Sequence, residues 1–201
     1  MADFTAFVLS QLPPPPARVL EIGCGSLGGV APALAAAGYD VLAIDPRAPE
    51  GPLFRQVRLE ELDDPGPFDA VVAGRVLHHV DPLGPALDKL TGLAPLLILD
   101  EFAWNHMDDV TAAWYERTYP QVEGPSGPPD VAAWLAEHRH LHTYEALRAE
   151  LDGRYEERSF ERLPYLHHWL GAAIEPAETE VLAAGKIRPL GWRYAGIRRA
   201  S

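Results

Sequence analysis

Short apolar runs recur along the first half of the chain, and each is ended by glycine, proline or a cluster of polar residues. Four of them have the length and composition of buried β-strands: 18–23, 39–45, 68–74 and 94–100. A further strand is predicted at 54–59. A lead-in helix precedes these strands and two more helices lie between them, with predicted ranges 3–12, 28–38 and 85–92. Apolar strands that alternate with helices are typical of a parallel sheet covered on both faces.

The pattern changes after Phe102. The stretches 104–119 and 130–150 have helical character, and the proline- and glycine-rich segment 121–129 between them excludes regular structure. We interpret this region as a helical cap with a flexible joint. Because its composition differs from that of the strands before it, we expect 104–150 to be an insertion in the main fold.

Two more strands and a helix are predicted near the C-terminus. The strands are expected at 154–163 and 191–198, with a short helix at 175–184 between them. A chain of 201 residues is long enough for one substantial core and too short for two full domains. We therefore expect a single domain, 1–201.

The glycine-rich segment between the first strand and the next helix carries the main chemical signal. Gly23, Gly25 and Gly28 satisfy the pattern G-x-G-x-x-G, and Asp45 ends the following strand. Glycines let the backbone pass close to a ligand, and a carboxylate at that strand end can accept both hydroxyls of a ribose. The arrangement predicts an adenosine-bearing cofactor. The alternative is a tight turn with a solvated aspartate.

Glu21 discriminates between such cofactors. In a nicotinamide site the pyrophosphate lies over this turn, where a carboxylate two residues before Gly23 would repel it. A buried anion needs a cation, and the α-ammonium group of S-adenosylmethionine is a suitable one. The alternative for Glu21 is an ion pair with Arg18 or Arg47.

Three segments resemble class I S-adenosylmethionine-dependent methyltransferases of the small-molecule type: 19–25, 39–46 and 68–81. The similarity is close over 17–103, and the final helix and strand resemble that family's antiparallel seventh strand. The resemblance implies an α/β fold with a Rossmann-like seven-stranded mixed sheet, mostly parallel with one antiparallel strand. Helices are expected on both faces, together with the helical cap insertion.

The resemblance also implies S-adenosyl-L-methionine as the cofactor, with S-adenosyl-L-homocysteine as its product. Ten residues are expected to bind it: Glu21, Gly23, Cys24, Gly25, Asp45, Pro46, Leu59, Glu60, Gly74 and Arg75. Among them, Glu21 is expected near the methionine amine and Asp45 at the ribose. Gly74 and Arg75 are expected to line the methionine end.

Two positions depart from the family pattern. Leu27 stands where a third close glycine is often found, in a turn one residue longer than the common form. Arg58 stands where many relatives have an acid for the adenine amino group. Adenine recognition is therefore expected to fall to the backbone of Leu59 or to Glu60.

His79 is the candidate catalytic residue. In similar methyltransferases its position often faces the acceptor, where a general base is needed if the acceptor is a hydroxyl or a protonated amine. The alternative is a histidine that only packs or caps. Substrate contacts are expected from residues that follow the fifth strand: Glu101, Trp104, Asn105, Trp114 and Tyr115. The alternative for the aromatic residues is that they hold the cap helices onto the sheet.

Composition and charge exclude some classes of binding partner. The formal net charge of −12 would repel a phosphate backbone, so nucleic acid is not expected as a partner. Cys24 is a single cysteine and leaves no intramolecular disulfide, and no leader or membrane span is recognised, so we expect a cytoplasmic protein. His138, His140 and His142 lack the spacing of a zinc site, so no metal is expected.

These observations predict an enzyme that methylates a small molecule, with the acceptor atom left open. One alternative is a protein that binds S-adenosylmethionine without transferring its methyl group. Another is a nicotinamide-dependent reductase, which would share the glycine turn and Asp45. The chain lacks a Tyr-x-x-x-Lys pair, because neither Lys89 nor Lys186 has a tyrosine four residues earlier.

Overall fold

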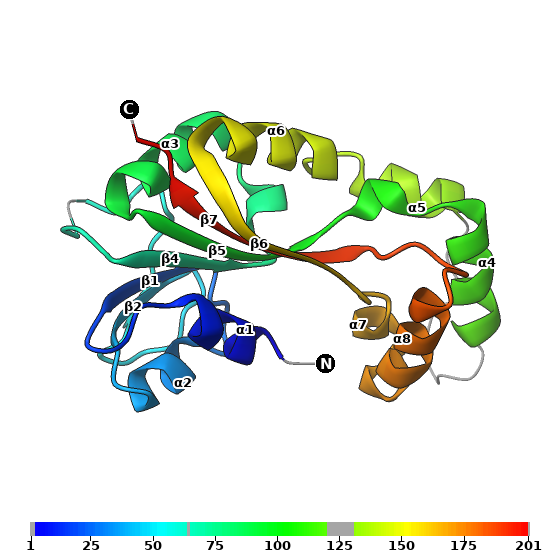
Figure 1. Ribbon diagram of the computed structural model, residues 1–201, viewed down its shortest axis with the longest axis horizontal. Coiled ribbons are helices and arrows are strands. Elements are labelled where there is room, and N and C mark those ends of the chain that lie inside the picture. The colour runs from blue at the N-terminus through cyan, green and yellow to red at the C-terminus, as the bar shows by residue number, and fades with distance from the viewer. Residues whose placement is uncertain (1–2, 64, 120–130, 201) are drawn as a thin grey trace. The chain divides into compact units, whose positions relative to one another are not determined.

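A seven-stranded sheet is the central element of the protein, seen in a computed structural model that describes residues 3–63, 65–119 and 131–200 (Figure 1). The strand order is β3-β2-β1-β4-β5-β7-β6. The strands are β1 (Arg18–Ile22), β2 (Asp40–Ile44), β3 (Phe54–Arg55), β4 (Ala70–Gly74), β5 (Leu96–Phe102), β6 (Tyr155–Leu163) and β7 (Gly191–Arg198). All seven predicted strands are present, which confirms the Rossmann-like sheet.

Strands β1 to β5 run parallel. In this register Leu20 of β1 lies opposite Leu42 of β2 and Val71 of β4. Strand β7 runs the other way beside β5, since Arg198 N donates to Pro95 O at one end of the pair. At the other end, Ala103 N donates to Leu190 O. The sheet is therefore mixed, mostly parallel with one antiparallel strand, as predicted.

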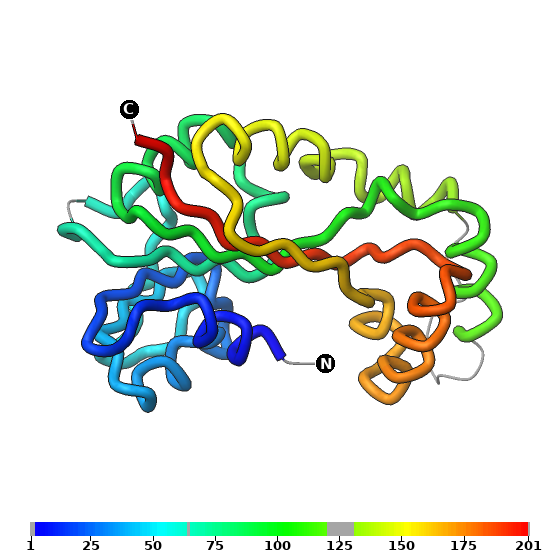
Figure 2. Tube along the Cα trace, viewed as in Figure 1, coloured from blue at the N-terminus to red at the C-terminus, as the bar shows by residue number. Residues whose placement is uncertain are grey.

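Helices cover both faces of this sheet. α1 and α2 lie on one face, and α3 and α6 lie on the other (Figures 1 and 2). The helices are α1 (Phe4–Gln11), α2 (Ala31–Ala36), α3 (Leu83–Leu93), α4 (Asp109–Thr118), α5 (Val131–His138), α6 (Tyr144–Arg154), α7 (His167–Leu170) and α8 (Glu175–Ala183). None of the helices in the described part of the chain is long and apolar enough to cross a membrane.

The chain forms two compact units. The first consists of Met1–Glu101, Leu147–Phe160 and Arg193–Ser201, and the second of Phe102–Ala146 and Glu161–Trp192. Aliphatic side chains of α1, α2 and the parallel strands form the core of the first unit, because strands buried on both faces need apolar residues at every position.

The core of the second unit is rich in aromatic residues. Phe102 stacks on Tyr165 with ring centroids 4.5 Å apart, and Trp134 meets the edge of Phe102 at 5.8 Å. Such ring pairs add specific contact energy to the burial of their apolar area. The predicted cap, 104–150, contributes α4 and α5 to this unit, while most of α6 belongs to the first.

Some predicted elements differ in extent. The stretch 130–150 forms two helices, because residues 139–143 interrupt it and Thr143 Oγ1 accepts a hydrogen bond from Ala146 N at the start of α6. The helix predicted at 28–38 begins only at Ala31, since the glycines before it form turns. The segment 121–129, predicted to be irregular, lies outside the described residues.

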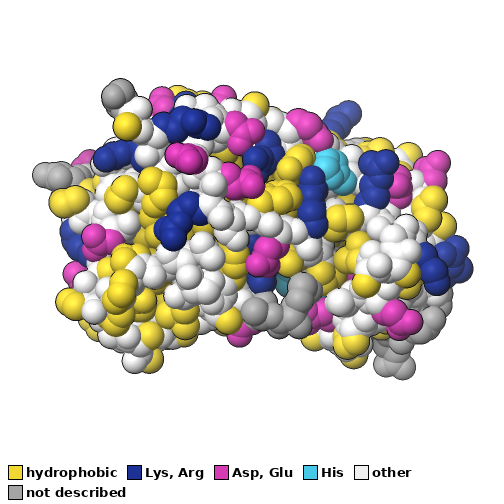
Figure 3. Space-filling model, in the orientation of Figure 1, with side chains coloured by type: hydrophobic (Ala, Val, Ile, Leu, Met, Phe, Trp, Pro, Cys, Tyr) yellow, Lys and Arg dark blue, Asp and Glu magenta, His cyan; other side chains and the backbone are white. Residues whose placement is uncertain are grey.

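On the face drawn in Figure 3, dark blue basic and magenta acidic side chains are interspersed. The excess of negative charge in the sequence is therefore not gathered into one patch on this face.

Candidate functional site

A cavity of about 330 Å³ opens where β1, β2 and β4 end, within the first unit. The carboxyl ends of parallel strands are the usual place for ligands in open α/β sheets. Six of the predicted site residues line it: Gly23, Asp45, Pro46, Leu59, Glu60 and His79. Seven others complete the lining: Ile22, Ile44, Val57, Arg58, Val76, Val80 and Asp81.

Gly23 is required at the wall of this cavity for two reasons. Its φ of 72° lies in the left-handed region, and a Cβ added to it would lie 2.6 Å from Val76 Cβ. The backbone of the first turn and the side chain of the turn after β4 therefore touch. Gly25, also with a positive φ, has no atom within 4 Å of an added Cβ and faces open space.

Glu21 is buried at the end of β1. Its Oε1 accepts a hydrogen bond from Val30 N at 2.9 Å, and its Oε2 accepts one from Ala31 N at 2.7 Å. Burial raises the pKa of Glu21 to about 7, and these two amide bonds oppose that rise. Within the chain, backbone amides rather than a cation satisfy this carboxylate.

The alternative ion pairs of Glu21 are not formed, because both arginines have other partners. Arg18 pairs with Asp40 at 3.5 Å, and Arg47 lies 4.0 Å from Asp45. Position 29 requires glycine, since a Cβ there would lie 1.9 Å from Glu21 Oε1.

Asp45 directly follows β2, and its side chain is 12% exposed. Its Oδ1 accepts a hydrogen bond from Arg47 N at 2.7 Å. Its Oδ2 makes no hydrogen bond with any of the described residues, so one oxygen of the pair remains available at the cavity. An aspartate in this state can accept a hydrogen bond from a hydroxyl group of a ligand.

The adenine-side candidates also lie in the lining. Leu59 is buried there, and Glu60 is exposed with its carbonyl oxygen accepting from Lys89 Nζ at 3.1 Å. Arg58, noted as a departure from the family pattern, is part of the same wall. Val57 adds apolar surface beside them.

Five predicted cofactor residues do not line the cavity: Glu21 and Gly25, described above, and Cys24, Gly74 and Arg75. Cys24 is buried in the core of the first unit, and burial followed by the charges of Glu21 and Asp45 raises the pKa of its thiol to about 12. A Cβ on Gly74 would lie 3.1 Å from the Phe4 ring. Arg75 has a φ of 56°, and its backbone N donates to Asp100 O at 2.6 Å.

His79 is exposed and lines the cavity, beside His78, whose ring centroid lies 4.2 Å away. Glu101, predicted to contact substrate, is fully buried instead, and its carboxylate contacts His78 and the backbone of the turn after β4. His78 and Val76 were not predicted as site residues from the sequence. The Leu-His-His run 77–79 marks this turn in the sequence. The partner of His78, Glu101, lies in β5 and could not be identified from that run.

The remaining substrate candidates belong to the second unit, and none lines the cavity just described. Trp104 is buried and its Nε1 donates to His142 O at 3.1 Å. Tyr115 is also buried, which raises its pKa to about 12, whereas Trp114 is only partly buried against the same aromatic core. Asn105 donates to Glu145 at 2.7 Å. Contact of these residues with an acceptor stays a prediction.

His138 packs among these aromatic rings, with Nδ1 2.8 Å from Trp134 O. Over residues 3–63, 65–119 and 131–200, no three histidine, cysteine or acidic side chains are grouped so that they could hold a metal ion.

Comparison with known proteins identifies the family. The sequence model of a family described as "Methyltransferase domain" matches residues 1–167. No curated protein matches the chain. Among solved structures, an S-adenosylmethionine-dependent methyltransferase from Mesorhizobium loti is similar over 96% of both chains, with 18% identity and a TM-score of 0.60.

Two further similar structures are named for their substrates. The 1,6-didemethyltoxoflavin-N1-methyltransferase of Burkholderia thailandensis shares 17% identity, over 98% of this chain and 77% of that one, with a TM-score of 0.58. The magnesium protoporphyrin IX methyltransferase of Synechocystis PCC 6803 shares 18% identity, over 97% and 76%, with a TM-score of 0.55. The chain therefore belongs to the methyltransferase-domain family, and its fold is that of the S-adenosylmethionine-dependent enzymes of class I.

Proposed function

We propose that this chain transfers the methyl group of S-adenosylmethionine to a small-molecule acceptor and binds that cofactor in the cavity at the ends of β1, β2 and β4. One observation carries the proposal. Asp45, whose Oδ2 makes no hydrogen bond with the described residues, lines the same cavity as Gly23 and Leu59. Its volume of about 330 Å³ falls within the range of roughly 300–1,000 Å³ found for small-molecule sites.

The nucleoside half of the cofactor fits the side of the cavity formed by β2 and the segment after it. Asp45 would accept the ribose hydroxyls, with Pro46 beside it. Leu59 offers an apolar surface to the adenine ring, and Glu60 an acceptor for its amino group. Arg58 in the same wall has no acceptor to offer and would stay at the rim.

The methionine half would lie over the glycine turn, where Gly23 and Gly25 keep side chains out of the way. Cys24, whose thiol is buried in the core, would contribute its backbone only. Glu21 would act as a negative charge beneath the turn, and a nearby ammonium group would favour its ionised form. Gly74 and Arg75 would border this end through the backbone of the turn after β4.

When bound, the cofactor supplies a methyl group already activated by a sulfonium. Since the transfer is an in-line displacement, the protein has mainly to position the acceptor and exclude water. His79, exposed at the cavity wall, would take the proton released by a hydroxyl or protonated amine acceptor.

A small acceptor is supported by the acidic chain, which disfavours nucleic acid, and by the similar enzymes whose names specify small molecules. Of the acceptor candidates, Asn105 and Trp114 keep part of their surface exposed, whereas Glu101, Trp104 and Tyr115 are buried. We place the protein in the cytoplasm, because its one cysteine requires no oxidising compartment.

Calorimetric titration tests the cofactor. We expect S-adenosylhomocysteine to bind with a Kd on the order of micromolar, and NADH not to bind. Binding of NADH without S-adenosylhomocysteine would reverse the assignment.

The ribose contact is tested by a pair of substitutions on the same strand. Asp45→Ala should weaken S-adenosylhomocysteine binding at least about tenfold, equivalent to ~1.4 kcal/mol. Asp40→Ala, at the opposite end of β2 and away from the cavity lining, serves as the control and should leave the affinity unchanged. Equal affinity in both variants would show that the ribose lies elsewhere.

A further inference from the structure

The turn after β4 forms one wall of the cavity, and a buried glutamate holds it. Glu101 is fully buried near the end of β5. Its Oε1 accepts hydrogen bonds from Val76 N at 3.1 Å and Leu77 N at 2.7 Å. Its Oε2 lies 2.5 Å from His78 Nδ1. Three consecutive residues of the turn therefore converge on one carboxylate.

Two chains of contact lead from Glu101 to the cavity. Through its backbone, Val76 is held against Gly23, and both of these residues line the cavity. Through its ring, His78 is held beside His79, the candidate base in the same lining. Glu101 itself does not line the cavity.

We propose that Glu101 is a positioning residue of the methyltransferase site, which fixes Val76 and His79 by means of its hydrogen bonds to the turn 76–78. The inference rests on the proposed function, because the position of this wall matters only if the cavity binds the cofactor. The bonds act together: a buried carboxylate that loses a donor keeps the cost of its desolvation, so a shift of any one residue of the turn is opposed.

Glu178 in the second unit provides a matched control. It is 1% exposed and accepts from Tyr165 N at 2.6 Å, Leu166 N at 2.8 Å and His167 N at 2.8 Å. Its Oε2 also lies 3.1 Å from His167 Nδ1, so Glu178, like Glu101, is a buried carboxyl group bonded to the backbone of a turn and to a histidine ring of that turn. The turn that Glu178 holds contributes nothing to the lining of the cavity.

Substitution by leucine separates a positioning role from a structural one. Glu101→Leu and Glu178→Leu should both lower the thermal midpoint, because each leaves backbone amides unpaired. Only Glu101→Leu should weaken S-adenosylhomocysteine binding, by at least about tenfold, while Glu178→Leu should stay within about twofold of the wild type. Glu101→Gln, which keeps the Oε1 acceptor, should fold even if the leucine variant does not and should lose about threefold.

His78 gives an independent readout by rescue. His78→Leu removes the donor to Glu101 Oε2 and should weaken binding about fivefold. His78→Asn places an amide N–H near the position of Nδ1 and should restore the affinity to within about twofold of the wild type.

The titrations separate the two proposals. Absence of S-adenosylhomocysteine binding in the wild type would count against the proposed function. Wild-type binding together with unchanged affinity in Glu101→Gln and His78→Leu would overturn the positioning role. So would an equal loss of affinity in Glu178→Leu.

Discussion

Glutamates buried beside turns accept hydrogen bonds from the surrounding backbone. Glu21, Glu101 and Glu178 each direct carboxylate oxygens at consecutive backbone N–H groups. Buried amides at turns need acceptors, and one carboxyl group offers two oxygens that can accept from neighbouring N–H groups. The chain therefore uses buried carboxyl groups to hold loops in place.

The pKa of Glu21 predicts a pH dependence of stability. Because burial raises this pKa from its usual 4.5 to about 7, the folded protein holds a proton between these values that the unfolded chain has released. Stability should then fall as the pH rises from about 5 to about 7. Relative to Glu21→Gln, the wild type should lose about 1–3 kcal/mol over this range in urea denaturation. Parallel curves for the two proteins would show that Glu21 does not titrate there.

Removing the hydroxyl of Tyr194 is expected not to destabilise the protein. Its hydroxyl is buried without a hydrogen-bond partner among the described residues, and burial raises its pKa to about 12. Tyr194→Phe removes this group and keeps the ring that faces Arg148 at 5.2 Å. Its unfolding free energy should be unchanged or higher by about 1 kcal/mol. A loss of that size in urea denaturation would mean that the hydroxyl has a partner in solution.

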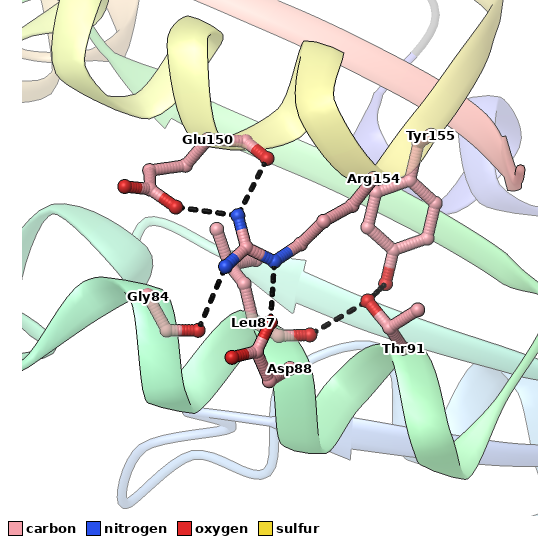
Figure 4. A network of polar contacts seen from close by, with 7 residues as sticks. All are labelled: Gly84, Leu87, Asp88, Thr91, Glu150, Arg154 and Tyr155. Carbon is pink, nitrogen blue, oxygen red and sulfur yellow. Dashed lines mark hydrogen bonds and ion pairs between the residues drawn. The ribbon is translucent and has the colours of Figure 1, made fainter.

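At the scale of elements, a polar network fastens α6 to α3 (Figure 4). Arg154 at the end of α6 binds Asp88 Oδ1 at 2.7 Å and Gly84 O at 3.4 Å, both on α3, and also pairs with Glu150. One turn further along α3, Thr91 Oγ1 lies 2.9 Å from the hydroxyl of Tyr155. Two helices far apart in sequence are thus joined by bonds to a single guanidinium group.

This network should contribute to stability. Arg154→Met keeps much of the side chain's bulk and removes its bonds, and it should lower the free energy of unfolding by about 1–2 kcal/mol. Arg158→Met on β6 is the control, because Arg158 is exposed and pairs with no described residue. Chemical denaturation of the two variants checks this, and equal stabilities would show that the network adds nothing.

The bounds of a helix or strand could be predicted where the sequence around its ends carries a clear local signal. The bounds of β7 agree with the sequence, because an apolar run after Pro189 marks it clearly. β3 is shorter than the predicted strand 54–59, since only Phe54 and Arg55 pair with β2. The break between α5 and α6 was missed, because apolar spacing continues across it and the Thr143 cap is a weak signal.

At the scale of the whole molecule, the parallel strands bring together the segments that line the cavity, which are distant in sequence. Gly23 and Asp45 could be predicted because each follows a recognisable strand within a known spacing. The contacts of Glu101 could not, since they depend on β4 and β5 lying side by side and on which way one side chain points. Its assignment to the acceptor rested on sequence position alone.

Ligand binding should be visible across the whole chain by hydrogen exchange. With S-adenosylhomocysteine at about a hundred times its Kd, the folded state gains about 2.7 kcal/mol by mass action. Local slowing should be strongest in the segments that line the cavity, around 22–23, 45–46, 57–60 and 76–81. Slowing confined to 102–146 would place the ligand in the second unit and contradict the site.

The antiparallel strand β7 has a consequence for synthesis on the ribosome. Strand β5 is translated long before β7, yet β7 separates it from β6 in the finished sheet. Until β7 emerges, a nascent chain carries the unpaired amides of β5 as an open edge, which other polypeptides can join. Shielding by chaperones would matter most in that interval.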